Sequence, residues 1–210
     1  MSMKNRHVLG EAVRHLILII LALYTLAPLL FLFVNAFKSN NEIIASPVAL
    51  PEHWTLQYIK TAMEAINFGK ALGLTFIITF FSILLLVIVS SFAAWAMVRS
   101  KTILSNIVFL CFTAAMLVPF QSLMYPLLSV FEKMGLKNVQ GLILMYGGFG
   151  LSMSVFLYHG FIKSVPASLE EAAVLDGANL FQMFFKVVFP LLKGTTVTVI
   201  VLNGMWIWND

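Results

Sequence analysis

The sequence predicts an all-α, polytopic membrane protein, a bundle of five transmembrane helices joined by loops. Hydrophobic residues make up 60% of the 210-residue chain and charged residues only 10%, whereas about a quarter of the residues in a soluble domain are charged. Long charge-free segments recur, and most exceed the roughly 20 residues that a helix needs to cross the hydrocarbon core. Lipid offers no partner to backbone polar groups, so these segments are expected as helices. The predicted spans cover residues 16–37, 71–98, 103–124, 139–162 and 195–210.

The distribution of basic residues predicts how these helices are oriented. Three basic residues lie within the first fifteen positions, and Arg99 and Lys101 lie between the second and third spans. Lys and Arg concentrate in cytoplasmic loops, so residues 1–15 are predicted to be a cytoplasmic tail of a multi-pass protein of the cell membrane. The apolar run from Leu16 to Val34 is longer than the roughly 7–15 residues of a signal-peptide core, so we expect it to remain as the first span.

The segment between the first and second spans is predicted to lie on the outer, non-cytoplasmic side of the membrane. Its lysines are balanced by an equal number of glutamates, which gives no inward bias. Pro47, Pro51 and Trp54 indicate an extended stretch at the membrane surface. A short amphipathic helix is expected after it, over residues 55–68.

The third span, residues 103–124, is expected to be kinked or ended by prolines at positions 119 and 126. Residues 127–138 would form an outer connection, and the fourth span would return the chain to the inner side. Loop 163–194 is then cytoplasmic. The chain stops at Asp210, so we expect the fifth span to be incomplete and a sixth span to be missing.

Loop 163–194 combines charge, turn residues and a helix pattern, as no other long segment after the N-terminal third does. Ser168, followed by Glu171, forms a capping-box pattern that predicts the start of a helix. Asp176-Gly177 is a turn signal, and Gly177 suits a left-handed cap. A second helix is expected from about Asn179.

The second helix of this loop is predicted to carry an aromatic face. Phe181, Phe184, Phe185 and Val188 recur at spacings of three and four residues, and Pro190 is expected to break the helix. Two short helices with apolar faces suit a groove on a soluble partner. The alternative is a hairpin that lies on lipid headgroups, but an anionic inner leaflet would repel its acidic residues.

Three short motifs follow one another in this loop: Glu171-Ala172-Ala173, Asp176-Gly177-Ala178 and Phe189-Pro190-Leu191-Leu192. In this order and spacing they resemble the EAA loop of ABC importer permeases, the membrane subunits of binding-protein-dependent uptake systems. Other segments resemble the carbohydrate branch of that family, as in maltose-type and multiple-sugar permeases: Val118-Pro119-Phe120-Gln121, Gly135-Leu136, Pro166-Ala167-Ser168-Leu169-Glu170-Glu171 and Trp208-Asn209-Asp210. The resemblance extends from about Leu16 to the last residue. Gly194 departs from it, since sugar permeases commonly have a proline there.

The resemblance implies that the loop contains a coupling helix that sits in a cleft of a cytoplasmic ATPase subunit. The residues that it assigns to this contact are Glu170, Glu171, Ala172, Ala173, Asp176 and Gly177. It also implies a second permease subunit, identical or different, two ATPase subunits and an extracytoplasmic solute-binding protein as partners.

The sequence contains no Gly-x-x-x-x-Gly-Lys-Ser/Thr motif for binding phosphate. We therefore expect no enzymatic activity and no bound cofactor or metal on this chain, with ATP and Mg held by the partner subunits. Basic residues form no stripe beside exposed aromatic residues, so nucleic acid is not expected as a partner.

The second, third and fourth spans contain no Asp, Glu, Lys or Arg. Charged or proton-coupled transport places ionisable groups at membrane depth, so their absence favours a neutral, polar solute. The candidate residues for its pathway are Asn203, Trp206, Gly148 and Ser152. An amide and an indole suit a sugar, but the same residues also suit hydrogen bonding, packing and close approach between helices.

These observations favour a permease subunit of an ATP-driven importer for a neutral carbohydrate. The alternatives are a permease of the same type for a non-sugar solute and a non-functional truncated permease fragment. An intramembrane enzyme is disfavoured, because the middle spans lack carboxylates and His159 has no acidic or serine partner four residues away.

Overall fold

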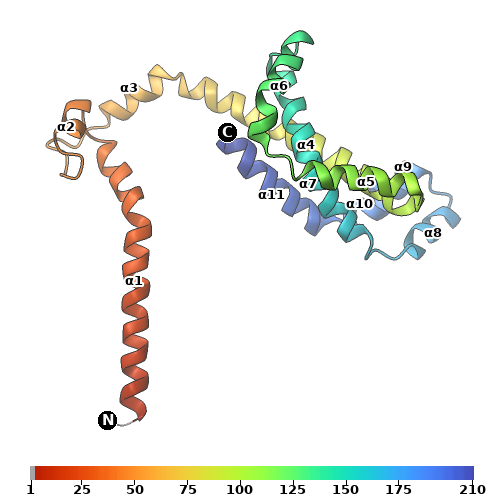
Figure 1. The fold of residues 1–210 in the computed structure, drawn as a ribbon, viewed down its shortest axis with the longest axis horizontal. Helices are drawn as coiled ribbons and strands as arrows, with labels where there is room; N and C mark the ends of the chain where they lie inside the picture. Colours follow the sequence, from red (N-terminus) through yellow and green to blue (C-terminus); the bar gives the residue numbers. More distant parts are fainter. Residues whose placement is uncertain (1–2) are drawn as a thin grey trace. The chain divides into compact units, whose positions relative to one another are not determined.

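The computed structural model describes residues 3–210, and within this range every regular element is a helix (Figure 1). The side chains of residues 3–9, which include the basic Lys4 and Arg6, lie outside what it describes. The chain divides into two compact units, residues 1–71 and 72–210. Each unit is described by itself.

The first unit begins with α1 (Met3–Asn35), a helix that contains a candidate membrane span over Gly10–Asn35. The rest of the chain leaves its apolar side chains largely uncovered, as expected for a helix that is surrounded by lipid. The helix starts well before the predicted residue 16, so the basic leader continues the same helix.

A short helix, α2 (Asn40–Ala45), follows α1 and was not predicted. Ser39 and Glu42 form its capping box, and the Glu42 carboxylate accepts hydrogen bonds from the backbone N–H of Ser39 and of Glu52. These bonds, with that of Ser39 first, hold the pKa of the Glu42 carboxyl below its ordinary value. The buried Lys38 donates to the carbonyl of Ser46 at 3.0 Å, so two charged side chains close this loop on itself.

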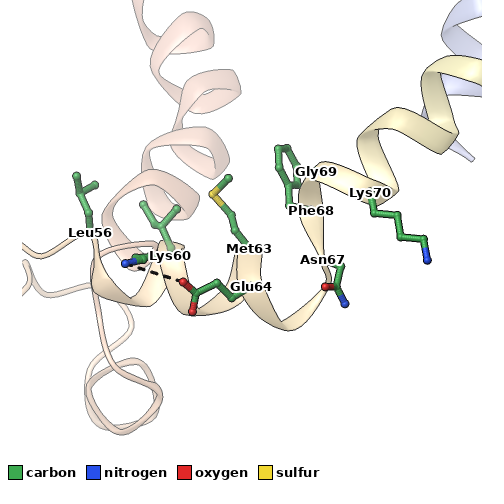
Figure 2. A pocket seen from close by; sticks show the side chains of 9 residues that line it. Leu56, Lys60, Met63, Glu64, Asn67, Phe68, Gly69 and Lys70 are labelled. Carbon is green, nitrogen blue, oxygen red and sulfur yellow. Dashed lines mark ion pairs between the residues drawn. The ribbon is translucent and has the colours of Figure 1, made fainter.

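The amphipathic helix predicted over residues 55–68 is present as α3 (Gln57–Ala65), after the expected non-helical stretch that contains both prolines. An open groove of about 920 Å³ runs along α3 and the first residues of the next helix. Figure 2 shows the Lys60–Glu64 ion pair, 3.9 Å long, at the edge of this groove. Both side chains are well exposed, so the pair contributes little to stability.

Two long, unbroken helices form the frame of the second unit: α4 (Phe68–Ser100) and α7 (Val139–Ile162). Both qualify as membrane spans and agree with the predicted second and fourth spans. Small residues let neighbouring side chains come close, since a methyl group on Gly150 would lie 2.6 Å from Leu86 of α4. Close packing of this kind drives helix association in lipid, where the hydrophobic effect between helices is absent.

The third predicted span, 103–124, is not one helix. It is divided into α5 (Ile103–Ala115) and α6 (Phe120–Lys133), which meet at a bend of 105°. Pro119, the N-cap residue of α6, has no N–H to continue the earlier helix. The signal of Pro119 was therefore right, although the helix ends earlier than predicted, whereas Pro126 lies inside α6 and does not end it. The expected outer connection, residues 127–138, is helical as far as Lys133, and Gly135, with a φ of +69°, follows the end of α6.

The chain after α7 turns through α8 (Ser168–Leu175), α9 (Leu180–Met183), the π-helix η1 (Phe184–Val188) and α10 (Phe189–Leu191). It then enters α11 (Lys193–Asn209) through a bend of 77°. The described chain contains three helices that are long and apolar enough to cross a membrane, or up to five such spans if each bent pair of helices is counted as one span. The main buried cluster unites side chains of α4, α7, α8, η1 and α11.

Candidate functional site

The predicted hairpin forms at the end of the second unit where α4 and α7 finish, and α8 is its first arm (Figure 1). The expected capping box does not form, because α8 begins with Ser168 already inside the helix and Ala167 as the N-cap residue. The end of α8 follows the prediction. Gly177 has a φ of +79°, and the N–H of Ala178 donates to the carbonyl of Ala173 at 2.9 Å.

The next helix also starts where the sequence predicts. Asn179 caps α9, and Gln182 completes a capping box with it. Four residues, 176–179, therefore separate the two helices, and each helix has its own defined end.

The six residues assigned to partner contact divide between two faces of α8. Glu171, Ala172, Asp176 and Gly177 are exposed, whereas Glu170 and Ala173 are 7% and 8% exposed. The outer face also presents two apolar side chains, Val174 at 57% and Leu175 at 88% exposure. Apolar side chains that project from a short polar hairpin suit a contact with a protein partner.

Glu170 faces inward, so its place differs from the surface contact that was expected for it. Its carboxylate accepts hydrogen bonds from the indole Nε1 of Trp95 at 3.1 Å and from Nε of Arg99 at 2.8 Å, and it forms an ion pair of 2.7 Å with a terminal nitrogen of Arg99. Glu171, one residue later, points elsewhere because each residue advances an α-helix by about 100°. The Glu-Glu pair thus combines one buried anchor with one exposed charge.

The second arm of the hairpin carries the predicted aromatic face, and only half of that face is buried. Phe184 and Val188 are fully buried, whereas Phe181 and Phe185 are 65% and 47% exposed. The wider π-turn changes the register, and Phe189 donates its N–H to the carbonyl of Phe184, five residues back. Pro190 lacks an N–H and so favours this interruption, while the helical path continues to Leu191 before the bend.

A cavity of about 320 Å³ lies between α5, α6, α7 and α11, inside the second unit. Three of the four candidate pathway residues line it: Ser152, Asn203 and Trp206. No charged side chain contributes to its lining, which otherwise consists of small and apolar residues. Gly148 opens instead on a neighbouring cavity of about 270 Å³, which Ser152 also reaches.

Asn203 has a structural contact as well as a place at the cavity. Its amide nitrogen donates to the hydroxyl of Ser154 on α7 at 3.2 Å and to the carbonyl of Val199 at 2.9 Å. Trp206 stands within an aromatic group, with ring centroids 5.5 Å from Tyr146 and 5.9 Å from Phe120. Within this stretch of α7, Gly147 and Gly150 approach another helix, whereas Gly148 has open space beside it.

Sequence reasoning did not single out several residues that the fold brings to these sites. Trp95 and Arg99 lie four residues apart on α4 and therefore share one face, which was a usable signal. Their common partner, about 70 positions later, could not be identified from spacing alone. Ser154 is likewise found only through its contact with Asn203.

Residues 87–210 match the family profile described as the inner membrane component of binding-protein-dependent transport systems. The chain belongs to this family. The match contains the α8–α9 hairpin and the cavity of about 320 Å³, so both lie in the family's shared region.

Relatives of known description support this membership. The "Probable starch degradation products transport system permease protein AmyC" of Thermoanaerobacterium thermosulfurigenes is 44% identical over 192 residues, which is 91% of this chain and 70% of that protein. The multiple sugar-binding transport system permease protein MsmG of Streptococcus mutans is 32% identical, over 99% of this chain and 76% of its own length.

The fold also matches a solved structure. A crystal structure of a bacterial ABC transporter, involved in import of the acidic polysaccharide alginate, contains a chain with a TM-score of 0.81. It covers all of this chain and 74% of the other, with 24% sequence identity. The similarity shows that this protein has the fold of an ABC transporter permease, a membrane subunit.

Proposed function

We propose that this permease subunit helps to import a neutral carbohydrate in an ATP-driven transporter. An extracytoplasmic binding protein would deliver the solute, and the chain would form the membrane pathway together with a second permease subunit. In this arrangement the N-terminus lies in the cytoplasm, and two ATPase subunits bind ATP and Mg.

The exposed face of α8 is the observation that carries the coupling part of this proposal. It places Leu175, 88% exposed, beside the exposed charges of Glu171 and Asp176. An apolar side chain gains free energy when a partner's groove covers it, and the two carboxylates can pair with basic residues around that groove. Gly177 permits the sharp reversal that leaves this tip projecting.

The cavity between α5, α6, α7 and α11 supports a neutral solute. An amide and a hydroxyl, from Asn203 and Ser152, provide polar contacts, and the Trp206 ring provides an apolar face. Sugars present hydroxyls together with apolar ring faces, so this mixed lining suits them. The relatives named for starch degradation products, multiple sugars and melibiose, raffinose and stachyose favour the same class of solute.

A second candidate is a small, neutral solute that is not a typical nutrient sugar. One relative, 23% identical over 93% of this chain, is an osmoprotective compounds uptake permease protein from Synechocystis. The same charge-free cavity would accept such a compound.

The test is uptake by the complete transporter, with this chain and its partner subunits in lipid vesicles. Labelled maltotriose, melibiose and raffinose are offered with the binding protein and ATP, beside a neutral osmolyte and an anionic sugar acid. ATP-dependent uptake of a neutral sugar supports the proposal. Preference for the osmolyte supports the second candidate, and preference for the sugar acid contradicts both.

A further inference from the structure

We propose that Trp95, Arg99 and Glu170 form a clamp through which α8 moves the second membrane span. This inference rests on the coupling role proposed for α8 and names the residues that would transmit its motion. They act as positioning residues, because α8 itself provides the surface for the partner. The clamp joins two segments more than 70 positions apart in the chain.

The clamp is made by contacts of both Glu170 carboxylate oxygens with α4. One oxygen accepts a hydrogen bond from Nε of Arg99 at 2.8 Å and lies 2.7 Å from a terminal guanidinium nitrogen as an ion pair. The other oxygen accepts from Nε1 of Trp95 at 3.1 Å. Bonds to an ionised, buried carboxylate are stronger than neutral ones, and two-point contact with Arg fixes their direction.

Arg99 also connects the clamp to the end of the fourth span. Its guanidinium donates to the carbonyl of Val165 at 3.0 Å, three residues after α7 ends and three before α8 begins. A single side chain of α4 therefore holds the junction between α7 and α8. Arg99 and Glu170 keep only 22% and 9% of their side-chain surface exposed, so solvent does not weaken the pair as it would on the surface.

The indole of Trp95 extends the clamp to the second arm of the hairpin. Its ring lies 5.2 Å from that of Phe184 in η1, and both residues belong to the main buried cluster. Trp95 thus bonds α8 through its nitrogen and packs on η1 through its ring. The two rings are tilted by 42° to one another, and aromatic contacts of this kind contribute beyond the burial of the rings.

A displacement of α8 can reach the membrane spans by two paths, and the clamp is one of them. The close backbone neighbours of α8 are α9 and η1, which continue through α10 into α11. This covalent path can carry a displacement of α8 to the fifth span. The link to α4 is made by long side chains of the clamp, so it provides a separate path to the second span. Buried ion pairs are weak evidence for stability but can specify one geometry, which is the property that transmission requires.

The experiment measures solute taken up per ATP hydrolysed in the complete transporter, reconstituted with its partner subunits. Glu170→Gln leaves Arg99 without a counter-charge, and Arg99→Lys keeps the charge but loses the two-point contact. Trp95→Phe keeps an aromatic ring but removes the indole N–H that donates to Glu170, and it should disturb folding least. Glu132→Gln is the matched control, since this exposed glutamate pairs with Lys137 in the outer connection.

The clamp predicts that ATPase subunits still copurify with each variant. The ratio of uptake to hydrolysis should fall about five-fold or more for Glu170→Gln, a typical size for coupling between sites. Arg99→Lys and Trp95→Phe should give smaller losses, and Glu132→Gln should match the unchanged protein. Glu171→Gln, on the outer face, should instead weaken copurification of the ATPase.

Two results would overturn the clamp. One is an unchanged ratio in all three clamp variants. The other is a parallel loss of uptake and hydrolysis with less assembled transporter, which would mean a purely structural role. Failure of the proposed function is a different outcome, in which the unchanged protein retains no ATPase subunit and takes up no solute.

Discussion

Gly150 offers a direct test of how closely α4, α7 and α11 pack. A Cβ atom at this position would lie 2.6 Å from the Asn203 Oδ1 atom and 2.6 and 2.9 Å from the two methyl carbons of Leu86. Leu86 is fully buried, and the amide of Asn203 is bonded to Ser154, so relieving the contact requires Leu86 to repack or Asn203 to leave that bond. Gly150→Ala should therefore strain the contact between three helices.

The size of the effect follows from two opposing contributions. Overpacking a core commonly costs 1–3 kcal/mol, so contacts this short indicate about 3 kcal/mol. Replacing glycine by alanine inside a helix returns up to about 1 kcal/mol. The net loss should be about 2 kcal/mol, which corresponds to a fall in Tm of roughly 4–8 °C for a chain of this size.

The assay is thermal unfolding of the purified transporter, followed by tryptophan fluorescence. Gly160→Ala is the matched control, because Gly160 lies on the same helix with nothing within 4 Å of the added Cβ. This control should leave Tm unchanged or raise it slightly. Equal Tm values for the Gly150 and Gly160 variants would refute the packing described here.

Two further predictions concern the single residues Gly177 and Glu42. Gly177→Ala should lower the stability of the hairpin by about 1 kcal/mol, because the φ of this residue is +79°, although the space beside it is open. Hydrogen exchange over α8 should become faster in this variant and stay unchanged in the control Gly194→Ala. Unchanged exchange in Gly177→Ala would contradict the prediction. The lowered pKa of Glu42 means that its contribution to stability is present above the ordinary value of 4.5 and is lost as pH falls through the folded-state pKa. The protection of the α2 amides, meaning their exchange rate corrected for the intrinsic effect of pH, should thus fall on acidification below 4.5, and Glu42→Gln should flatten this dependence. An identical dependence in both proteins would argue against the cap.

The sequence predicted the features that depend on local chemistry or on lipid. Charge-free segments must be helical in a membrane, so α4 and α7 could be predicted closely. Gly177 and Asn179 were identified correctly because a left-handed cap and an N-cap are set by neighbouring residues. The start of α8 near Ser168 was predicted correctly, but the capping box was not, since Ser168 lies inside the helix and its hydroxyl makes no cap.

Other features depend on contacts between distant segments. The proline at position 119 predicted an interruption, but the 105° bend between α5 and α6 depends on tertiary packing. Glu170 and Glu171 look equivalent in sequence, and only the folded chain shows that Glu170 meets Arg99. The same holds for the cavity, where Ser152, Asn203 and Trp206 come together from two helices while Gly148 opens elsewhere.

The proposed coupling requires above all that α8 meets an ATPase subunit at the cytoplasmic face, and cross-linking from Leu175 tests this contact most directly. The native Cys111, which is exposed, is first replaced by alanine, and Leu175→Cys is then introduced as the only thiol. In membranes that contain the complete transporter, we predict cross-linking of this thiol to the ATPase subunit and protection from a membrane-impermeant thiol reagent added outside. Labelling from the outside, without a cross-link to the ATPase, would contradict the account.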